Sequence, residues 1–309
     1  MGNCFSISNL HLNILNPMNR EARVGTEYKS LSEVNDQRLD ALVGRRNGQV
    51  INVSTTTFEL MKQAHEVLRE VGFSTFPDGP GNQEAAIWAS KGVSNGRMLM
   101  ARTSNRDFGY LSPGRVSVIK RAGGGSCAEH MAVTTMELFR RKNTVPIFNV
   151  YESNIGHNIT VMGDWRDRTI GDQAVVVDAW QGLKKIYTYG ERINTVTPEI
   201  EYVLPLAKDM PPVDSAIRKA LATKPVSERK IINYMKSSTM VNYGREGAID
   251  KILELRNINI AYSSITGTNN IHTAYRSPNG EQSEFNSTPK QYLQNYLRAR
   301  EEIDNRIPR

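Results

Sequence analysis

The stretch that most constrains the fold is a run of glycines that leads directly into a helical pattern at residues 123–139, GGGSCAEHMAVTTMELF. Apolar residues recur in it at helical spacing, and they predict one buried helix face: Ala128, Met131, Ala132, Met136 and Phe139. Cys127 is therefore expected at the N-terminus of this helix. The glycine run is expected to be a flexible loop that lets a substrate backbone approach closely.

Cys127 suits two roles at such a junction. A helix N-terminus stabilises a thiolate through the helix dipole and the free backbone N–H groups, as a nucleophile requires. A free cysteine is also commonly a small buried hydrophobe. The only other cysteine, Cys4, lies near the start of the chain, so no disulfide framework is expected. The junction alone fits both roles.

Two apolar segments downstream favour the nucleophile. His157 opens HNITVMGD and Asp178 lies in QAVVVDAWQG, and both segments are typical of strands bounded by turn residues. A thiol nucleophile needs a base, and the base needs a carboxylate to fix its tautomer. The chain supplies Cys, His and Asp in that order.

The sequence of residues 123–190 resembles the transglutaminase-like and papain-like core, as it occurs in bacterial type III secretion effectors and toxins. The resemblance rests on the Gly-Ser-Cys-x-Glu-His run and the Val-Val-Val-Asp-Ala-Trp run. It implies that Cys127 is the nucleophile, His157 the general base and Asp178 the orienting acid, with Trp180 packed beside them. Proteases, transglutaminases and glutamine deamidases share this arrangement, so the reaction stays open.

The expected fold class is α+β, with the cysteine-bearing helix packed on an antiparallel sheet and with a helical C-terminal extension. We expect a flexible N-terminal segment over residues 1–50 that carries a lipid anchor and a secretion signal. The catalytic core is expected over 51–205 and the helical extension over 206–309.

Individual elements follow from local patterns. Helices are expected at 55–71, ending at Gly72, and at 83–91, and short strands at 97–102, 115–120, 146–152 and 185–190. In the C-terminal part, helices are expected at 214–222, 227–236, 247–255 and 289–303, and a polar loop at 263–287.

The catalytic assignment has alternatives. His130 lies three residues after Cys127 and could contact the thiolate from the same helix, but His157 is better placed to meet an aspartate as well. Gln173 and Asn158 are candidate side-chain donors to an oxyanion. Three other polar residues are expected to have structural roles. These are Glu129 as a first-turn helix charge, His65 as a partly buried structural histidine and His272 as a loop residue.

Composition excludes several classes of protein. The chain has 309 residues, 39% of them hydrophobic, and it contains neither an apolar run of membrane-spanning length nor a secretory signal. The net charge of +7 is dispersed, and no nucleic-acid-binding motif accompanies it. The Cys-x-Glu segment at Cys127 is also found in zinc deaminases, but the paired-cysteine segment that their zinc site requires is absent from this sequence. No nucleotide-binding motif occurs either. We therefore expect neither a metal nor a cofactor.

The first residues, Met-Gly-Asn-Cys-Phe-Ser, fit the pattern for N-myristoylation at Gly2, with Cys4 as a palmitoylation site. N-myristoylation is a eukaryotic modification, so we expect an effector that acts in a host cell, at the cytoplasmic face of the plasma membrane. The expected function is a cysteine-dependent hydrolase or acyltransferase that acts on an amide of a host protein. The alternative is a catalytically inactive, membrane-tethered effector that binds a host protein.

Membrane attachment is testable by fractionation of cells that express acylation variants. Gly2→Ala should move the protein from the membrane fraction to the soluble fraction. Cys4→Ser should cause a smaller, partial release, because one acyl chain gives only marginal membrane binding. If the Gly2→Ala protein stays with the membranes, the match to the acylation pattern is a coincidence.

Overall fold

The computed structural model describes residues 28–30, 37, 48–104, 108–109, 111–141, 143–180, 186–192, 196–204, 206, 215–237 and 273–306. Gly2, Cys4, His272 and the helix expected at 247–255 lie outside these residues. The predictions made for them therefore stay predictions.

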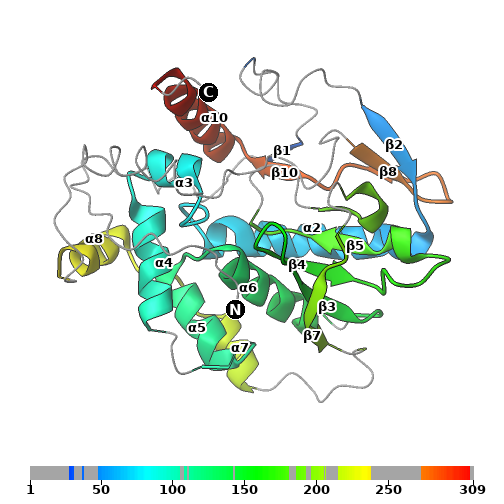
Figure 1. Ribbon diagram of the computed structural model, residues 1–309, viewed down its shortest axis with the longest axis horizontal. Helices are drawn as coiled ribbons and strands as arrows, with labels where there is room; N and C mark the ends of the chain where they lie inside the picture. Colours follow the sequence, from blue (N-terminus) through cyan, green and yellow to red (C-terminus); the bar gives the residue numbers. More distant parts are fainter. Residues whose placement is uncertain are drawn as a thin grey trace.

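A five-stranded sheet lies beside the cysteine-bearing helix, and every neighbouring pair of its strands is antiparallel (Figure 1). In spatial order its strands are β6 (Ile186–Thr188), β5 (Val175–Val177), β4 (His157–Met162), β3 (Ile147–Glu152) and β7 (Glu199–Leu204). Short turns join several of these apolar segments, and this arrangement was predicted from the sequence.

Two helices cover one face of this sheet, α2 (Thr55–Thr75) and α6 (Cys127–Arg140), and they also pack against each other (Figure 1). Their apolar stripes meet the inward residues of the sheet in the main core, which includes Phe58, Met61, Val133, Ile147, Met162, Val175 and Val177. The alternate residues of the same strands form a second core on the opposite face, which includes Phe148, Val150, Ile159, Val161, Trp165 and Val176. The α+β class is therefore confirmed.

Helix α2 begins as predicted and ends later than predicted. Ser54 caps it by accepting a hydrogen bond from the backbone N–H of Thr57. Gly72 does not end the helix, because the backbone N–H of Phe76 still bonds to the Gly72 carbonyl, at 2.9 Å. Burial of the Phe76 side chain, which is 2% exposed, favours this additional turn.

The short strands expected at 97–102 and 115–120 are wrong. These residues belong to α4 (Val93–Thr103) and α5 (Pro113–Ala122), which follow the short helix α3 (Glu84–Ala89). The sequence around α5 contained the correct signal, because Ser112 caps the helix and Pro113 occupies its first turn. In α4 the residues are buried on almost every side, which removes the amphipathic period that reveals a helix.

The C-terminal part is only partly helical. The helices α7 (Ser215–Leu221), α8 (Glu228–Ser237) and α10 (Lys290–Arg306) lie close to where they were expected. The polar loop expected at 263–287 is wrong in its described part, which contains β8 (Thr273–Arg276) and β9 (Gln282–Ser283).

Strands from the two ends of the chain pair with each other. Strand β8 pairs in parallel with β2 (Gln49–Asn52), and β10 (Ser287–Pro289) pairs antiparallel with β1 (Tyr28–Ser30). Such pairs join segments far apart in the sequence, which local patterns do not reveal. Residues 28–30 and 49–50 therefore lie in strands, although a flexible segment was expected over residues 1–50.

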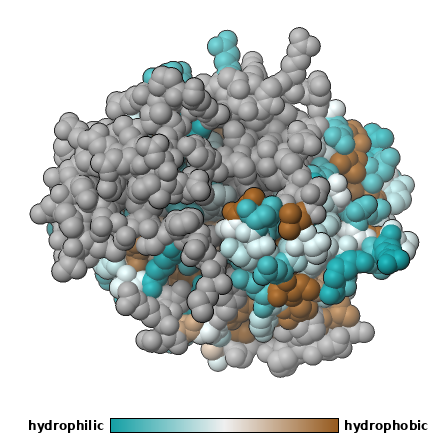
Figure 2. Space-filling view, viewed as in Figure 1, coloured by the Kyte–Doolittle hydropathy of each residue, from teal (hydrophilic) through white to brown (hydrophobic). Residues whose placement is uncertain are grey.

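Strand β7 lies at one edge of the five-stranded sheet, as far as the described strands show. It exposes three large apolar side chains by 40% to 44%, namely Ile200, Tyr202 and Val203. Figure 2 shows hydrophobic residues at the surface in the part of the view where Figure 1 draws β7. This edge thus exposes apolar side chains, and β3 lies between it and β4, the strand that begins at His157.

Phe285 tests whether the C-terminal residues belong to the main core. Its ring is 4% exposed and lies 5.3 Å from the ring of Phe58 on α2. Phe285→Ala should lower the free energy of unfolding by about 3–5 kcal/mol in urea denaturation. Phe108→Ala, at a ring that is 44% exposed, is the control and should cost far less. Equal losses in both variants would contradict the packing described.

Candidate functional site

Cys127 is the first residue of α6, as predicted, and it is 2% exposed. Ser126 caps the helix, and the Glu129 carboxylate reaches back to accept hydrogen bonds from the Ser126 backbone N–H and hydroxyl, at 2.7 and 2.9 Å. Glu129 is thus part of a capping box, which agrees with its expected role in the first turn. The box fixes the backbone direction from which the thiol projects.

The glycine run does not serve as an open loop, and that expectation is wrong. A Cβ atom on Gly124 would lie 2.4 Å from the Cβ of Arg97, and one on Gly125 would lie 2.1 Å from the Cβ of Glu129. Gly123 ends α5 in the left-handed conformation, with φ of 73°. The glycines are needed because the chain passes through a space with no room for side chains.

A buried ion pair supports this passage. Arg97 is 0% exposed and donates to Asp78 at 2.5 Å, to the Ala122 carbonyl at 2.8 Å and to the Val226 carbonyl at 3.1 Å. A buried guanidinium requires such partners, because an unpaired buried charge is very costly. Arg97 therefore fixes the segment that leads into Cys127.

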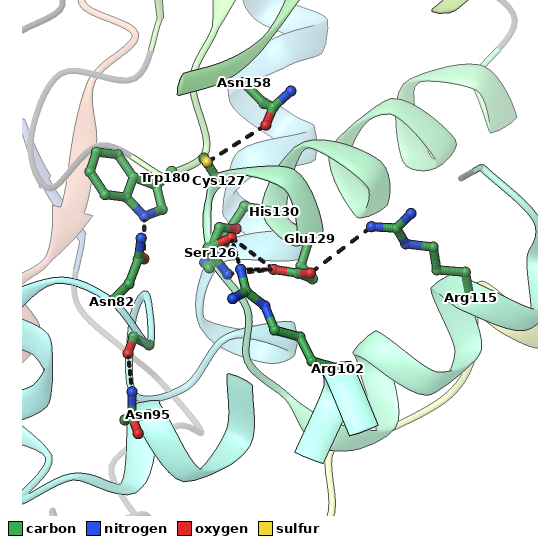
Figure 3. A network of polar contacts seen from close by, with 11 residues as sticks. Asn82, Asn95, Arg102, Arg115, Ser126, Cys127, Glu129, His130, Asn158 and Trp180 are labelled. Carbon is green, nitrogen blue, oxygen red and sulfur yellow. Dashed lines mark hydrogen bonds and ion pairs between the residues drawn. The ribbon is translucent and has the colours of Figure 1, made fainter. Parts of the chain in front are cut away.

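Two further arginines face the first turn of α6 (Figure 3). Arg102 donates to the Ser126 hydroxyl at 2.7 Å and lies 3.5 Å from the Glu129 carboxylate, and Arg115 lies 4.0 Å from it. Burial alone would raise the pKa of Glu129, but Arg102 and the hydrogen bonds from Ser126 outweigh it and lower that pKa. Glu129 is therefore held as a carboxylate in the interior.

His157 and Asp178 are brought together. His157 is the first residue of β4, Asp178 directly follows β5, and Nε2 of the imidazole lies 2.7 Å from Oδ2 of the carboxylate. Asp178 is 1% exposed and its Oδ1 accepts the Trp180 backbone N–H at 3.2 Å. A carboxylate on Nε2 favours the tautomer with its proton there, which places the imidazole lone pair on Nδ1.

Two aromatic side chains, Trp180 and Tyr187, lie near the His157–Asp178 pair. The Trp180 ring lies 4.9 Å from the His157 ring, in agreement with its expected position beside the site. Burial and the Asp178 carboxylate raise the pKa of the Tyr187 phenol well above its ordinary value. Tyr187 is therefore a neutral phenol near a buried carboxylate.

The thiol of Cys127 meets strand β4 at the residue next to His157. Its sulfur lies 3.7 Å from Oδ1 of Asn158, and α6 packs along β4 (Figure 3). The structure thus places the first turn of α6 against Asn158, the second residue of β4, and His157 alternates with Asn158 along this strand.

The alternative base, His130, has a different environment. Its Nδ1 lies 2.8 Å from the Ser126 carbonyl, and its ring stacks on Phe76 with 3.7 Å between the centroids. The side chain is 2% exposed and lies in the turn below the thiol. These contacts indicate that His130 supports the helix start.

Of the two candidate oxyanion donors, Gln173 lies elsewhere and that prediction is wrong. Its Oε1 accepts the Ser54 backbone N–H at 2.8 Å, so it supports the start of α2. Asn158 contacts the thiol, but through its oxygen. His65 was expected to be a partly buried structural histidine, and this is confirmed. Its Nδ1 lies 2.7 Å from the Phe285 carbonyl, and burial lowers its pKa.

Sequence reasoning missed the loop that holds Trp180. Asn82 accepts the indole N–H at 2.8 Å, and Gln83 donates to the Trp180 carbonyl at 2.6 Å. The Gly81 N–H also bonds to the Gly125 carbonyl at 2.9 Å, so this loop touches the residues before Cys127. The only signal in the sequence was a density of turn residues at 76–82, FPDGPGN.

The described residues contain neither a candidate metal site nor a candidate membrane-spanning helix. No group of three or more His, Cys, Asp or Glu side chains forms a metal-binding cluster in the part of the chain that the structure describes. Within the same residues, no helix combines the length and the hydrophobicity needed to cross a membrane.

Comparison with known proteins adds no relative. No protein-family model matches the sequence, and searches of curated proteins and of solved structures found no match. The resemblance to the transglutaminase-like and papain-like core therefore rests on the motifs around Cys127, His157 and Asp178 alone.

The capping box predicts how stability depends on pH. Folding lowers the pKa of Glu129, so its ionised form stabilises the fold above the ordinary pKa of a glutamate, and this contribution is lost as the pH falls through the lowered value. Glu129→Gln should therefore cost about 1–3 kcal/mol near neutral pH. In urea denaturation, the difference from wild type should shrink as the pH falls through the lowered pKa of Glu129.

Glu66→Gln on the exposed side of α2 is the matched control for that variant, because it removes the same charge from a solvated position. It should change the free energy of unfolding little at any pH. A Glu129→Gln deficit that stays constant from neutral to acidic pH would show that the carboxylate charge does not stabilise α6.

Proposed function

We propose that this protein is a cysteine-dependent hydrolase or acyltransferase that acts on amides of host proteins. The observation that carries the proposal is the buried 2.7 Å contact between His157 and Asp178, at the start of the strand whose next residue touches the Cys127 sulfur. An imidazole with a buried carboxylate partner is typical of a general base, and a cysteine at a helix N-terminus is typical of a nucleophile.

In the proposed mechanism, the Cys127 thiol gives its proton to Nδ1 of His157 and the sulfur attacks the carbonyl carbon of the amide. Asp178 holds the proton on Nε2 and stabilises the imidazolium that forms. His157 then returns the proton to the departing amine or ammonia, which leaves an acyl group on Cys127. The backbone N–H of Cys127, at the first position of α6, is a candidate donor to the oxyanion.

The fate of the acyl group defines the reaction class. Water releases a cleaved chain if the substrate is a peptide bond, or a glutamate if it is a glutamine side chain. A substrate amine in place of water gives transglutamination. These three reactions share the same residues, and they differ only in the amide and the acceptor that the surface admits.

The edge strand β7 supports a protein substrate. Its exposed Ile200, Tyr202 and Val203 lie on a described edge of the sheet, and Glu201 in the same strand contacts Asn158 beside the thiol. An extended segment of another protein can add to such an edge through backbone hydrogen bonds, with apolar side chains supplying further contacts.

The direct test is mass spectrometry of proteins from cells that express the wild type or Cys127→Ser. The wild type should produce cleaved chains, glutamines converted to glutamates, or new amide cross-links, and the variant should produce none of these. Identical protein profiles from both would favour the alternative, an inactive membrane-tethered effector that binds a host protein.

The two histidines near α6 should respond differently to substitution. His157→Ala should lower the rate on an identified substrate by about 10²–10⁴-fold, as for loss of a general base, and Cys127→Ala should abolish it. His130→Ala should mainly lower thermal stability, because it loses the stacking on Phe76. An inactive but stable His130→Ala protein, together with an active His157→Ala protein, would assign the base to His130.

A further inference from the structure

Strand β7 departs from regular pairing at one residue, Glu201. The consecutive residues Asn149 and Val150 of β3 lie opposite Tyr202 and Ile200, so Glu201 is the extra residue of a β-bulge. A bulge turns a side chain away from the direction that regular pleating would give it, and bulges are common beside active sites.

The Glu201 carboxylate is directed to strand β4, where it accepts a hydrogen bond of 2.7 Å from Nδ2 of Asn158. This contact fixes which way the amide faces, because an ionised carboxylate only accepts hydrogen bonds and so requires the NH₂ group of Asn158. The amide oxygen of Asn158 must then face the Cys127 sulfur, 3.7 Å away.

An amide oxygen also only accepts hydrogen bonds. The contact with Cys127 is therefore favourable when the sulfur carries a proton, and it is repulsive when the sulfur is a thiolate. The N-terminus of α6 acts in the opposite direction, since its backbone N–H groups favour the thiolate. Asn158 thus opposes the activation that the helix supplies.

We propose that Glu201 is a positioning residue that, through the Asn158 amide, holds the Cys127 thiol in its protonated form in the resting protein. The proposal builds on the proposed function, because it assigns a resting state to the nucleophile. Activation requires the hydrogen bond from the Cys127 thiol to the Asn158 oxygen to break. The thiol proton then passes to His157, and the electron pair of the S–H bond stays on sulfur. A resting thiol resists oxidation and alkylation.

Other ionisable groups lie in or against the first turn of α6, or next to Asn158 in the sheet. They come from α6 itself, from β4, from the end of β5, from α4 and from α5, and they are Glu129, His130, His157, Asp178, Arg102 and Arg115. The test must therefore separate the Asn158 amide from the general effect of charge.

The test measures the rate at which iodoacetamide alkylates Cys127 as a function of pH, with the Cys127 peptide quantified by mass spectrometry. In Glu201→Gln the side chain both donates and accepts, so the two amides can reverse together and present the Asn158 NH₂ to a thiolate. The pH midpoint of alkylation should fall by about one unit, which is about tenfold in rate below the midpoint.

Glu199→Gln, on the same strand, is the matched control, since it removes the same charge from another exposed position. It should leave the midpoint within a few tenths of a unit. Glu201→Gln is then repeated in an Asn158→Ala background, as in a double-mutant cycle. The comparison isolates the part of the shift in the pH midpoint of alkylation that depends on the Asn158 side-chain amide.

The proposal predicts that Asn158→Ala itself lowers the midpoint and abolishes the further effect of Glu201→Gln. A Glu201→Gln shift that persists in the Asn158→Ala background, or that equals the Glu199→Gln shift, would overturn it. Alkylation requires no turnover, so these outcomes are independent of whether the protein proves to be a hydrolase. Loss of protein modification by Cys127→Ser tests that question separately.

Discussion

One fully buried side chain, Arg97, connects the segments from which the candidate site is built. It pairs with Asp78 at the start of the loop that grips Trp180, and it donates to the carbonyls of Ala122 and Val226. Its own Cβ packs against Gly124, in the run that leads to Cys127. Removing one partner of such a buried pair typically costs about 3–5 kcal/mol, so these segments are firmly held relative to one another.

This framework places opposing influences on a single sulfur atom. The N-terminus of α6 and the arginines at its first turn favour negative charge there, while the Asn158 oxygen and the nearby Glu201 carboxylate disfavour it. The helix effect amounts to about 0.3–1 kcal/mol at exposed helix ends. A single well-oriented hydrogen bond to the thiol is of the same order, about 0.5–1.5 kcal/mol. Substitution of Asn158 or Glu201 can therefore shift the balance.

Much of the candidate site was predictable from the sequence because its signals are local. The change from a glycine run to apolar residues at helical spacing correctly located the start of α6 at Cys127. The apolar strand segments located His157 and Asp178 at the start of one strand and just after the next, and the two side chains do meet. The resemblance of the motifs added the catalytic roles of Cys127, His157 and Asp178, and these roles stay predictions.

What the sequence did not reveal depends on contacts between distant segments. Asn82 and Gln83 form hydrogen bonds with Trp180, and β2 pairs with β8. Neither contact produces a periodic pattern in the sequence. The bulge at Glu201 likewise arises from a register shift between β3 and β7. The glycine run was misjudged for the same reason, because the need for glycine comes from the side chains that the run passes.

The pairing of nucleophile and base can be tested directly with a short reagent that carries two electrophilic carbons, 1,3-dibromoacetone. After its first carbon alkylates the cysteine at the helix N-terminus, the second reacts only with a nucleophile within reach. Digestion and mass spectrometry should identify a cross-link between Cys127 and His157. A cross-link from Cys127 to His130, or an alkylated Cys127 with no linked histidine, would contradict the central claim that Cys127 and His157 act together.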